Sequence, residues 1–374
     1  MSTPRRAPEV LLRRYWEDPD TPVVTAGLSV LSWAYRAAIA VRDRAYRWGV
    51  LPTGRLPCPV VSVGNLTLGG SGKTPTVELA VRTLLDMGAI PAVLSRGYGR
   101  VTRGVHVVAD RDGIRAEPRS AGDEPLLLAE RLPGVPVVVG ENRYEAGRVA
   151  VERCGATALV LDDGFQHRTL AKDLEIVAVE GTEPWGNGRL FPRGVLREPM
   201  SALRRANVVV VTNPAHQAAT ENIARSLRHH GSQAAVLTGS YRAEALRRAG
   251  EGAPQPPSAL AGRRVVAFAG LASPAGFVTT LAGLGATVAE LVDFPDHHPY
   301  TEADLLRVRS SARRAGASCV VTTEKDWVRL REVPRLDVEL WVLSVRLDMG
   351  ADRAALVEAL AETLRRKAAE RALP

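Results

Sequence analysis

The chain has 374 residues, 45% of them hydrophobic and 24% charged, a composition typical of soluble globular proteins that excludes a disordered or fully membrane-embedded chain. This length exceeds one ordinary hydrophobic core and predicts two domains. The formal net charge of +8 favours nucleic acid, an anionic membrane face or a phosphorylated substrate as partner, without choosing among them. The three cysteines are few and widely spaced, which does not suggest a disulfide framework and favours reduced thiols.

The N-terminal region predicts a helix rather than a cleaved signal. Acidic residues from Glu9 to Asp20 precede any apolar stretch, so the pattern of a signal peptide is missing. The uncharged stretch from Thr21 to Tyr35 is shorter than the ~20 residues of a membrane-spanning helix. Residues 22–48 combine apolar and aromatic side chains with arginines, as in helices that lie in a membrane interface. A helix packed on its own domain fits the same residues equally well.

Strand and helix patterns alternate from residue 60 onward, which predicts a mainly parallel sheet covered by helices. Apolar runs that predict strands lie at 60–63, 91–94, 105–108, 135–139, 157–161, 174–179, 207–211, 264–269, 286–291, 318–322 and 339–344. Helical patterns lie near 74–87, 123–132, 142–153, 275–283, 301–315 and 352–368. The run at 105–108 is also compatible with a small hairpin. Residues 243–257 are charged, then rich in Gly and Pro, and predict a linker or a long surface loop.

A phosphate-binding loop is predicted between the first strand and the first helix of this series, where the chain reads VVSVGNLTLGGSGKTPTVELAV. The loop residues are Gly69, Gly70, Ser71, Gly72, Lys73 and Thr74. Glycines let the backbone curl and aim N–H groups at phosphate oxygens, and the helix N-terminus adds partial positive charge. Lys73 is expected to reach the β- and γ-phosphates of a nucleoside triphosphate, and the Thr74 hydroxyl to bind Mg²⁺. The strict motif has glycine where this chain has Thr67, but GxGKT between a strand and a helix supplies the expected context.

An acidic partner for the metal follows the strand predicted at 157–161. The chain reads TALVLDDGFQH there, so Asp162 and Asp163 end an apolar strand, as in a Walker-B element. A GTPase element for guanine is missing, because no lysine follows Asn213 and Lys325 comes one place too late in TTEKD. Lys325 is expected to form a structural ion pair instead. Several further polar clusters follow apolar strands, where open α/β sheets bind their ligands, and predict a large polar acceptor.

An ordered set of motifs resembles the tetraacyldisaccharide 4′-kinase (lipid A 4′-kinase) family. The motifs are GGSGKTP, LSRGYGR, GDEP, GENR, DDGFQH, GRLFPRGVLREP, FPDHHPYT and VVTTEKD, and they extend from about residue 60 to residue 327. Each motif alone is weak, but the order is specific. The N-terminus, the 243–257 stretch and the C-terminal helix match poorly, and Thr67 is what the family leads us to expect.

The resemblance implies an α/β fold of the P-loop NTPase-like type, with two α/β/α sandwich domains, a cleft between them that holds the active site, and an N-terminal amphipathic helix. The expected parts are residues 1–50 (interfacial helix region), 51–242 (P-loop kinase domain), 243–258 (linker or long loop) and 259–374 (second α/β domain with the DHH turn). The implied activity is ATP- and Mg²⁺-dependent phosphorylation of the 4′-hydroxyl of tetraacyldisaccharide 1-phosphate in lipid A biosynthesis. The implied location is the cytoplasmic face of a Gram-negative inner membrane, bound peripherally. No nucleic acid or obligate protein partner is expected.

The resemblance also implies roles for individual residues. Lys73 and the loop amides hold the phosphates. Thr74, together with Glu124, Asp162 and Asp163, is expected around the metal. Asp123 is expected to take the proton of the 4′-hydroxyl, assisted by His297 rather than His298. The residues expected at the sugar–phosphate head are Asn142, Arg143, Gln166, His167, Arg197 and Glu198. Arg143 or Arg197 suits the 1-phosphate, because arginine pairs bidentately with phosphate, although pairing with surface carboxylates is the alternative.

Two other classes of function fit parts of the pattern. One is a different P-loop enzyme, such as a metallochaperone-type GTPase or an ATP-dependent ligase. The other is a basic nucleic-acid-binding ATPase, which predicts salt-sensitive binding to polynucleotide. The sequence lacks an aromatic–basic stacking strip on a strand, which counts against the second class.

Overall fold

The structure, a computed structural model, describes residues 22–249, 253–271, 274–330 and 338–372. The acidic N-terminal segment that argues against a signal peptide lies outside the described residues. The chain forms two compact units. Unit 1 comprises residues 1–121, 128–240 and 349–374, and unit 2 comprises residues 122–127 and 241–348. Each unit is described separately.

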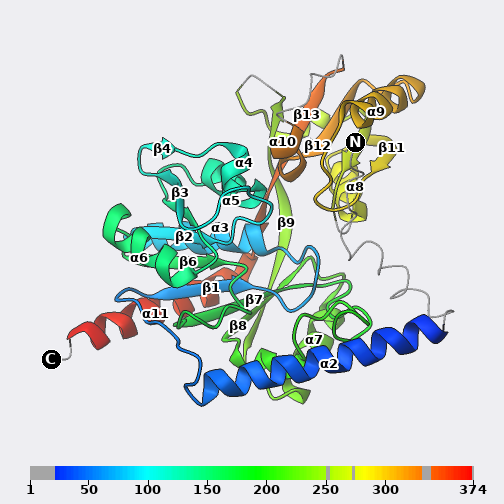
Figure 1. Cartoon of the computed structure of the whole chain (residues 1–374). Helices are drawn as coiled ribbons and strands as arrows, with labels where there is room; N and C mark the ends of the chain where they lie inside the picture. The colour runs from blue at the N-terminus through cyan, green and yellow to red at the C-terminus, as the bar shows by residue number, and fades with distance from the viewer. Residues whose placement is uncertain (1–21, 250–252, 272–273, 331–337, 373–374) are drawn as a thin grey trace. The chain divides into compact units, whose positions relative to one another are not determined.

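The sheet of unit 1 is mainly parallel (Figure 1), and its central strands are short and buried on both faces, whereas β3, β4 and β9 are partly exposed. Its strands are β1 (Val60–Gly64), β2 (Pro91–Ser95), β3 (His106–Asp110), β4 (Gly113–Ile114), β5 (Val137–Val139), β6 (Ala158–Asp162), β7 (Leu174–Glu180), β8 (Val208–Thr212) and the first part of β9 (Ala235–Arg248). Their order is β9-β8-β7-β1-β6-β2-β5-β3-β4. In this order, all neighbouring strands from β9 across to β5 are parallel, whereas β3 is antiparallel to both of its neighbours, β5 and β4. The alternative of a hairpin around residues 105–108 is therefore confirmed.

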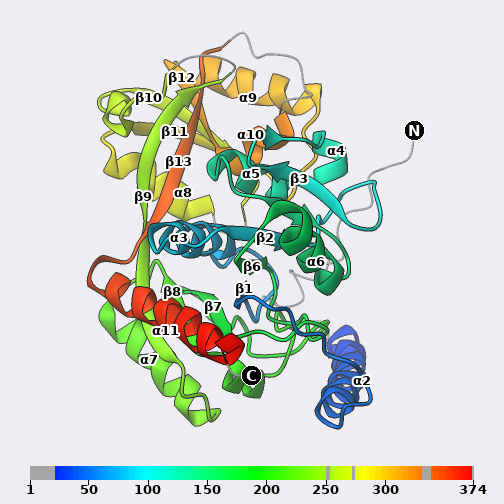
Figure 2. The ribbon, with the colours of Figure 1, turned by 90° about the vertical axis from the view of Figure 1, so that its left-hand side faces the viewer.

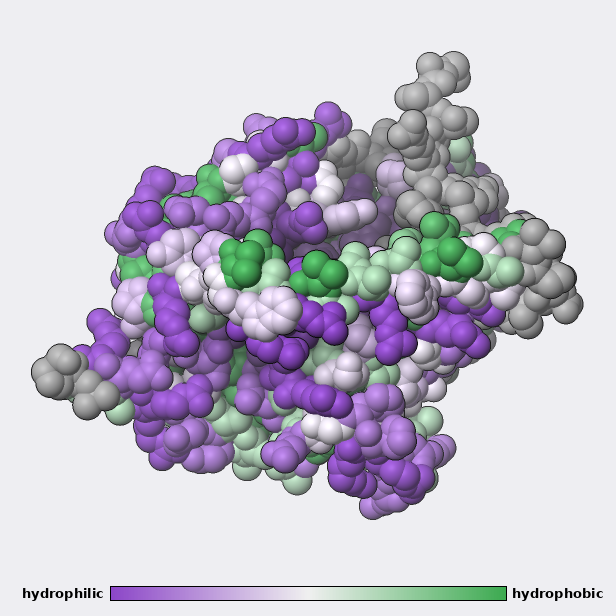
Figure 3. All heavy atoms as spheres, turned by 60° about the horizontal axis from the view of Figure 1, so that its bottom comes forward, coloured by the Kyte–Doolittle hydropathy of each residue, from purple (hydrophilic) through white to green (hydrophobic). Residues whose placement is uncertain are grey.

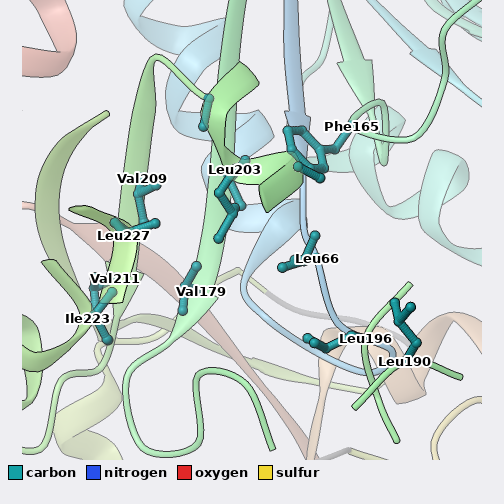
Figure 4. Close-up of a cluster of buried hydrophobic side chains, with 13 residues drawn as sticks. Leu66, Phe165, Val179, Leu190, Leu196, Leu203, Val209, Val211, Ile223 and Leu227 are labelled. Carbon is teal, nitrogen blue, oxygen red and sulfur yellow. The ribbon is translucent and has the colours of Figure 1, made fainter. Parts of the chain in front are cut away.

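Helices cover both faces of this sheet, as a parallel sheet requires. Helix α3 (Lys73–Asp86) packs on β1, β2 and β6, and α11 (Arg353–Ala372) packs on α3 and β7, in front of the sheet in Figure 2. On the opposite face lie α6 (Arg143–Cys154), η1 (Met200–Arg205) and α7 (Gln217–His229). Figure 4 shows the core beneath η1 and α7, where leucines and valines from β7, β8 and α7 meet Phe165. Helix α4 (Pro118–Ala121) completes unit 1, and α5 (Asp123–Arg131) begins in unit 2 and ends in unit 1.

Helix α2 (Pro22–Arg47) packs on unit 1 with one side and leaves the other side exposed. Tyr35 donates a hydrogen bond from its hydroxyl to the carbonyl of Arg197 (2.9 Å), and Ser32 donates to the carbonyl of Leu190 (3.0 Å). The exposed side carries Val30, Leu31, Trp33 and Val41, whose exposed fractions range from 57% to 74%. In Figure 3 hydrophobic side chains lie in a line along this helix. From Val24 to Arg47 the helix is long and apolar enough to cross a membrane, judged by length and composition.

Unit 2 is a second three-layer α/β structure. Its strands β10 (Arg264–Ala269), β11 (Thr287–Asp293), β12 (Cys319–Thr323), β13 (Leu340–Asp348) and the rest of β9 have the order β11-β10-β12-β13-β9. Helix α8 (Pro274–Gly283) packs on one face, whereas α9 (Glu302–Arg314) and α10 (Glu324–Leu330) pack on the other. The short helix η2 (Pro257–Leu260) belongs to unit 2, and η3 (Gly350–Asp352) belongs to unit 1.

The boundaries differ from the expected ones in three places. Residues 122–127, expected in the P-loop kinase domain, belong to unit 2. The expected linker at 243–258 is wrong at its start, because residues up to Arg248 continue strand β9 and the division between the units falls after Ser240. The C-terminal helix α11 belongs to unit 1 rather than to the second α/β unit. Its inner side buries Leu356 and Leu360, and Lys367 forms an ion pair with Asp173, which comes just before β7.

Candidate active site

The predicted phosphate-binding loop lies between β1 and α3, at the carboxyl edge of the unit 1 sheet. Gly69 and Gly72 have φ angles of 97° and 82°, a left-handed conformation that favours glycine. Gly72 is the N-cap of α3 and supplies no side-chain cap, so the first-turn N–H groups are not capped by a side chain. The hydroxyl of Ser71 is buried and has no hydrogen-bond partner among the described residues. A loop of this kind has the donors that phosphate oxygens require.

The predicted Walker-B strand β6 is the parallel neighbour of β1, with Asp162 in register with Val63. The Asp162 side chain is buried, with 1% exposed, and accepts a hydrogen bond of 3.0 Å from the hydroxyl of Ser95 at the end of β2. The following turn lies close to β1, because a Cβ atom on Gly64 would come within 2.6 Å of the backbone nitrogen of Phe165. Glycine at position 64 thus allows DDGF and the phosphate-binding loop to share one edge of the sheet.

Asp163 is surrounded by cations. Nη1 of Arg197 lies 2.8 and 3.0 Å from its two carboxylate oxygens, and Nζ of Lys73 lies 3.8 Å from one of them. Burial on its own would raise the pKa of Asp163, but Lys73 and Arg197 outweigh burial and hold this pKa below its usual value. Asp163 is therefore ionised at neutral pH. It links the loop lysine to the GRLFPRGVLREP segment.

The oxygen ligands available at this edge suit Mg²⁺ rather than a softer metal. They are the Thr74 hydroxyl and the carboxylates of Asp162 and Asp163, all hard donors. Among the described residues no group of three or more His, Cys, Asp or Glu side chains could hold a metal unaided. Magnesium characteristically takes one or two carboxylates and completes its shell with phosphate oxygens and water. The residues present fit a magnesium–nucleotide complex.

Three candidate substrate-binding residues have structural partners inside unit 1. Asn142 is the N-cap of α6 and accepts a hydrogen bond from the backbone N–H of Tyr144 (3.0 Å). Gln166 donates to the carbonyl of Asn65 (2.7 Å), which ties the DDGFQH turn to the start of the phosphate-binding loop. His167 lies 2.7 Å from the hydroxyl of Thr169, and burial, reinforced by nearby cations, lowers its pKa to about 4. His167 is thus neutral at pH 7, and the roles of all three with substrate stay predictions.

Arg143 occupies the first position of α6 and is 4% exposed. It donates to the carbonyl of Glu141 at 3.2 Å. Burial is the main cause that lowers the pKa of Arg143, and the negative charges of Asp162 and Asp163 oppose this shift. A buried guanidinium near these aspartates is a strong candidate for binding an anion at this edge of the sheet.

Glu198 lies among arginines instead of at the surface. Its side chain is 1% exposed, contacts Arg42 of α2 and accepts a hydrogen bond from Arg205 of η1 (2.6 Å). The neighbouring carbonyl of Arg197 accepts from Tyr35 of the same helix. Glu198 therefore supports the backbone that carries Arg197, a role that the sequence pattern did not reveal.

We expect Glu198→Ala to lower the free energy of unfolding by about 3 kcal/mol, because it leaves two half-buried arginines without their shared carboxylate. Urea unfolding followed by circular dichroism measures this change. Glu302→Ala, an exposed acidic residue at the start of α9, is the matched control and should change stability by less than about 0.5 kcal/mol. Equal effects of the two substitutions would contradict the supporting role.

The other predicted catalytic residues belong to unit 2. Asp123 and Glu124 form the first turn of α5, and His297 follows β11 with a φ angle of 58°. Arg329 of α10 donates to both Asp123 (2.5 Å) and His297 (2.9 Å). Burial, followed by the charge of Lys325, lowers the pKa of His297, although Asp296 opposes this shift. His297 is therefore neutral at pH 7.

Neighbouring polar residues of unit 2 have structural partners. Lys325 forms the predicted ion pair, with Nζ 2.7 Å from Asp296. His298 lies 3.0 Å from Asp304, which also belongs to the capping box that starts α9. These contacts give His298 a structural partner, and the choice of His297 over His298 stays a prediction.

Comparisons with known proteins place this chain in a family. Residues 24–365 match the family model described as Tetraacyldisaccharide-1-P 4′-kinase. The chain is similar to tetraacyldisaccharide 4′-kinases from Syntrophus aciditrophicus (42% identity over 90% of this chain and 93% of the relative) and Anaeromyxobacter dehalogenans (45% over 93% and 94%). It is also similar to the crystal structure of LpxK from Aquifex aeolicus in complex with ATP, with a TM-score of 0.72 and 30% identity over 91% of this chain and 99% of that one. The chain belongs to the tetraacyldisaccharide-1-P 4′-kinase family.

Proposed function

We propose that this protein transfers the γ-phosphoryl group of ATP to the 4′-hydroxyl of tetraacyldisaccharide 1-phosphate, a reaction of lipid A biosynthesis. The observation that carries the proposal is the cluster of Lys73, Asp163 and Arg197 beside a phosphate-binding loop, in a chain of this family. The relatives are named as kinases for this acceptor, and the neighbour from Aquifex aeolicus is an ATP complex.

In unit 1 the residues bind and orient the nucleotide. The N–H groups of the loop and the ammonium of Lys73 bind the phosphates and neutralise charge that spreads over the γ-phosphoryl oxygens. Thr74 and Asp162 would hold Mg²⁺, with Asp163 nearby and Glu124 as a further candidate from unit 2. When bound, Mg²⁺ would neutralise the negative charge that develops on the phosphates. Ser95 fixes the orientation of the Asp162 carboxylate through its hydrogen bond.

The proton of the acceptor is assigned to Asp123. As the 4′-oxygen forms its bond to the γ-phosphorus and the bond to the leaving ADP oxygen breaks, the hydroxyl proton passes to a carboxylate oxygen of Asp123. His297 assists from the same unit. The products are ADP and the bisphosphorylated lipid. For the sugar–phosphate head we retain Asn142, Arg143, Gln166, His167, Arg197 and Glu198, with Arg143 or Arg197 at the 1-phosphate; Glu198 contributes by holding the segment of Arg197.

Transfer of labelled γ-phosphate from ATP to tetraacyldisaccharide 1-phosphate in detergent micelles tests the proposal. We expect a bisphosphorylated lipid whose formation depends on Mg²⁺ and is lost in Lys73→Ala. Hydrolysis of ATP without lipid product would refute the acceptor and favour another P-loop enzyme. Turnover stimulated by polynucleotide would favour the nucleic-acid-binding ATPase.

The location that we propose is the cytoplasmic face of the Gram-negative inner membrane, with α2 in contact with the lipid. The exposed apolar side of α2 supports this proposal, because Trp33 and its apolar neighbours suit the interfacial region and the arginines of the last turn suit anionic headgroups.

We expect Trp33→Asp to weaken binding to vesicles that contain anionic phospholipid by about tenfold or more, because the indole no longer enters the interface. Vesicle co-sedimentation measures the effect. The matched control is Leu306→Asp, at an exposed leucine of α9 in unit 2, and it should bind like wild type. Undiminished binding of Trp33→Asp would show that this side of α2 does not contact lipid.

A further inference from the structure

Arg329 lies at the centre of the predicted catalytic residues of unit 2, although no sequence motif pointed to it. Its side chain is 5% exposed, and three groups surround its guanidinium. Nε donates to a carboxylate oxygen of Asp123 (2.5 Å), Nη2 lies 2.9 Å from Nδ1 of His297, and Nη1 lies 3.6 Å from Asp326. A planar guanidinium presents donors in fixed directions, so one side chain sets the positions of both Asp123 and His297.

Asp326 forms an ion pair with Arg329. Asp326 is fully buried and lies one turn before Arg329 on α10. Its carboxylate accepts hydrogen bonds from the backbone N–H of Gly270 (3.0 Å), the hydroxyl of Tyr300 (2.9 Å) and the hydroxyl of Thr323 (2.7 Å). Three donors from separate elements hold the carboxylate in one place, and Arg329 is held with it.

The contact with His297 also determines what that histidine can do. A guanidinium can only donate, so Nδ1 of His297 must be the acceptor, and the neutral ring carries its proton on Nε2. A ring in this tautomer offers a donor at Nε2 and has its lone pair at Nδ1 engaged. Nε2 lies 3.9 Å from a carboxylate oxygen of Asp296. His297 then acts by donating a hydrogen bond through Nε2, and the carboxylate of Asp123 is left to take the proton.

We infer that Arg329 is a positioning residue for phosphoryl transfer, which holds Asp123 and His297 in one arrangement and makes His297 a hydrogen-bond donor through Nε2. This inference rests on the proposed function, in which Asp123 is the base. It adds a residue and a tautomer to the proposed site, and it specifies the assistance of His297 as hydrogen-bond donation. The simpler alternative is that Arg329 only stabilises unit 2 by its ion pairs.

Two variants separate these alternatives. Arg329→Met fills similar space without donors, and we expect kcat to fall about 10- to 100-fold, as for a misplaced catalytic group, while KM for ATP changes less than about twofold. Ring nitrogen NMR should report a single Nε2–H tautomer of His297 in wild type and a mixture in Arg329→Met. Arg329→Lys keeps a positive charge next to Asp326, so the variant should fold. One ammonium cannot bind both Asp123 and His297 in fixed directions, so kcat should stay about tenfold reduced.

The control is Arg314→Met, at an exposed arginine of the same unit that pairs with Glu290 (2.8 Å). It should keep wild-type kcat and the wild-type His297 signal. An unchanged tautomer or wild-type kcat in Arg329→Met overturns the inference and leaves Asp123 as base. Wild-type turnover in Asp123→Ala would instead refute the assignment of Asp123 as the base. In the double variant Asp123→Ala/Arg329→Met, kcat should fall by the same factor as in Asp123→Ala alone. If the fall in kcat instead equalled the product of the two single-variant factors, Arg329 would have a separate, structural effect.

Discussion

Replacing Lys73 with alanine is expected to lower kcat for lipid phosphorylation by about 10³-fold, equivalent to about 4 kcal/mol of transition-state stabilisation. Lys73 is the first residue of α3, in a first turn that no side chain caps, and its own side chain is 12% exposed. A cation in such a partly desolvated place acts on the γ-phosphoryl charge with little solvent screening. Labelled phosphate transfer under saturating ATP measures the loss.

The arginine variant at the same position is a sharper test of how the ammonium acts. Lys73→Arg keeps the charge but replaces a compact ammonium with a larger planar group beside Asp163, so we expect activity to remain at least about tenfold reduced. Lys367→Ala is the matched control, because Lys367 of α11 also pairs with a carboxylate, that of Asp173, away from the phosphate-binding loop. Activity of Lys73→Ala equal to that of Lys367→Ala would contradict the proposed role.

Removing Lys73 should also change the titration of Asp163. Lys73 is the charge that lowers the pKa of Asp163 most, so its loss raises that pKa toward the usual value, because burial then acts with less opposition. In wild type, the pKa of Asp163 is lower in the folded state than in the unfolded state. Asp163 therefore stabilises the fold fully at pH values above its unfolded-state pKa, and this stabilisation is lost as the pH falls through its folded-state pKa. The acid side of the stability profile should therefore be shallower in Lys73→Ala.

Local sequence patterns determine the phosphate-binding loop and its neighbours, and these were predictable. The apolar runs of β1, β2, β6, β7 and β8 are mostly buried on both faces, and their continuous apolar character distinguishes them from surface segments. The glycines at 69 and 72 adopt the left-handed conformation that the motif demands. Strand β9 was missed because its residues alternate between charged and small side chains and are only half buried, which is how a surface loop also reads.

Pairings between distant segments were not predictable from patterns. Arg197 was expected at a phosphate, and its partner Asp163 lies 34 residues earlier in the chain. Glu198 bonds arginines from α2 and η1, and nothing in its local sequence distinguishes it from a surface glutamate. Arg329 lies 206 residues after Asp123, in a chain rich in arginine. Such contacts depend on how strands and helices pack, which residue spacing does not encode.

Asp123→Ala is expected to lower kcat by about 10²- to 10⁴-fold, the range for loss of a general base, with KM for ATP nearly unchanged because the nucleotide is assigned to the loop of unit 1. Asp123 is 41% exposed, so a substrate hydroxyl can approach it, and Arg329 fixes the direction of its carboxylate. Asp123→Asn keeps the shape and loses the basicity, so it should be impaired to a similar extent. His297→Ala should cost less, about tenfold, because a donor that orients the base is replaced more easily than the base.

The control for these variants is Glu302→Gln, which removes a carboxylate from the first turn of α9 as Asp123→Asn does from the first turn of α5. It should retain wild-type kcat, and thermal unfolding should show that all variants are folded. If Asp123→Asn retained wild-type turnover while Lys73→Ala abolished it, the phosphates would still be held as proposed but the hydroxyl would need another proton acceptor. A loose, largely dissociative transition state demands little of a base, so wild-type turnover in Asp123→Asn would mean that positioning and charge neutralisation alone produce the rate.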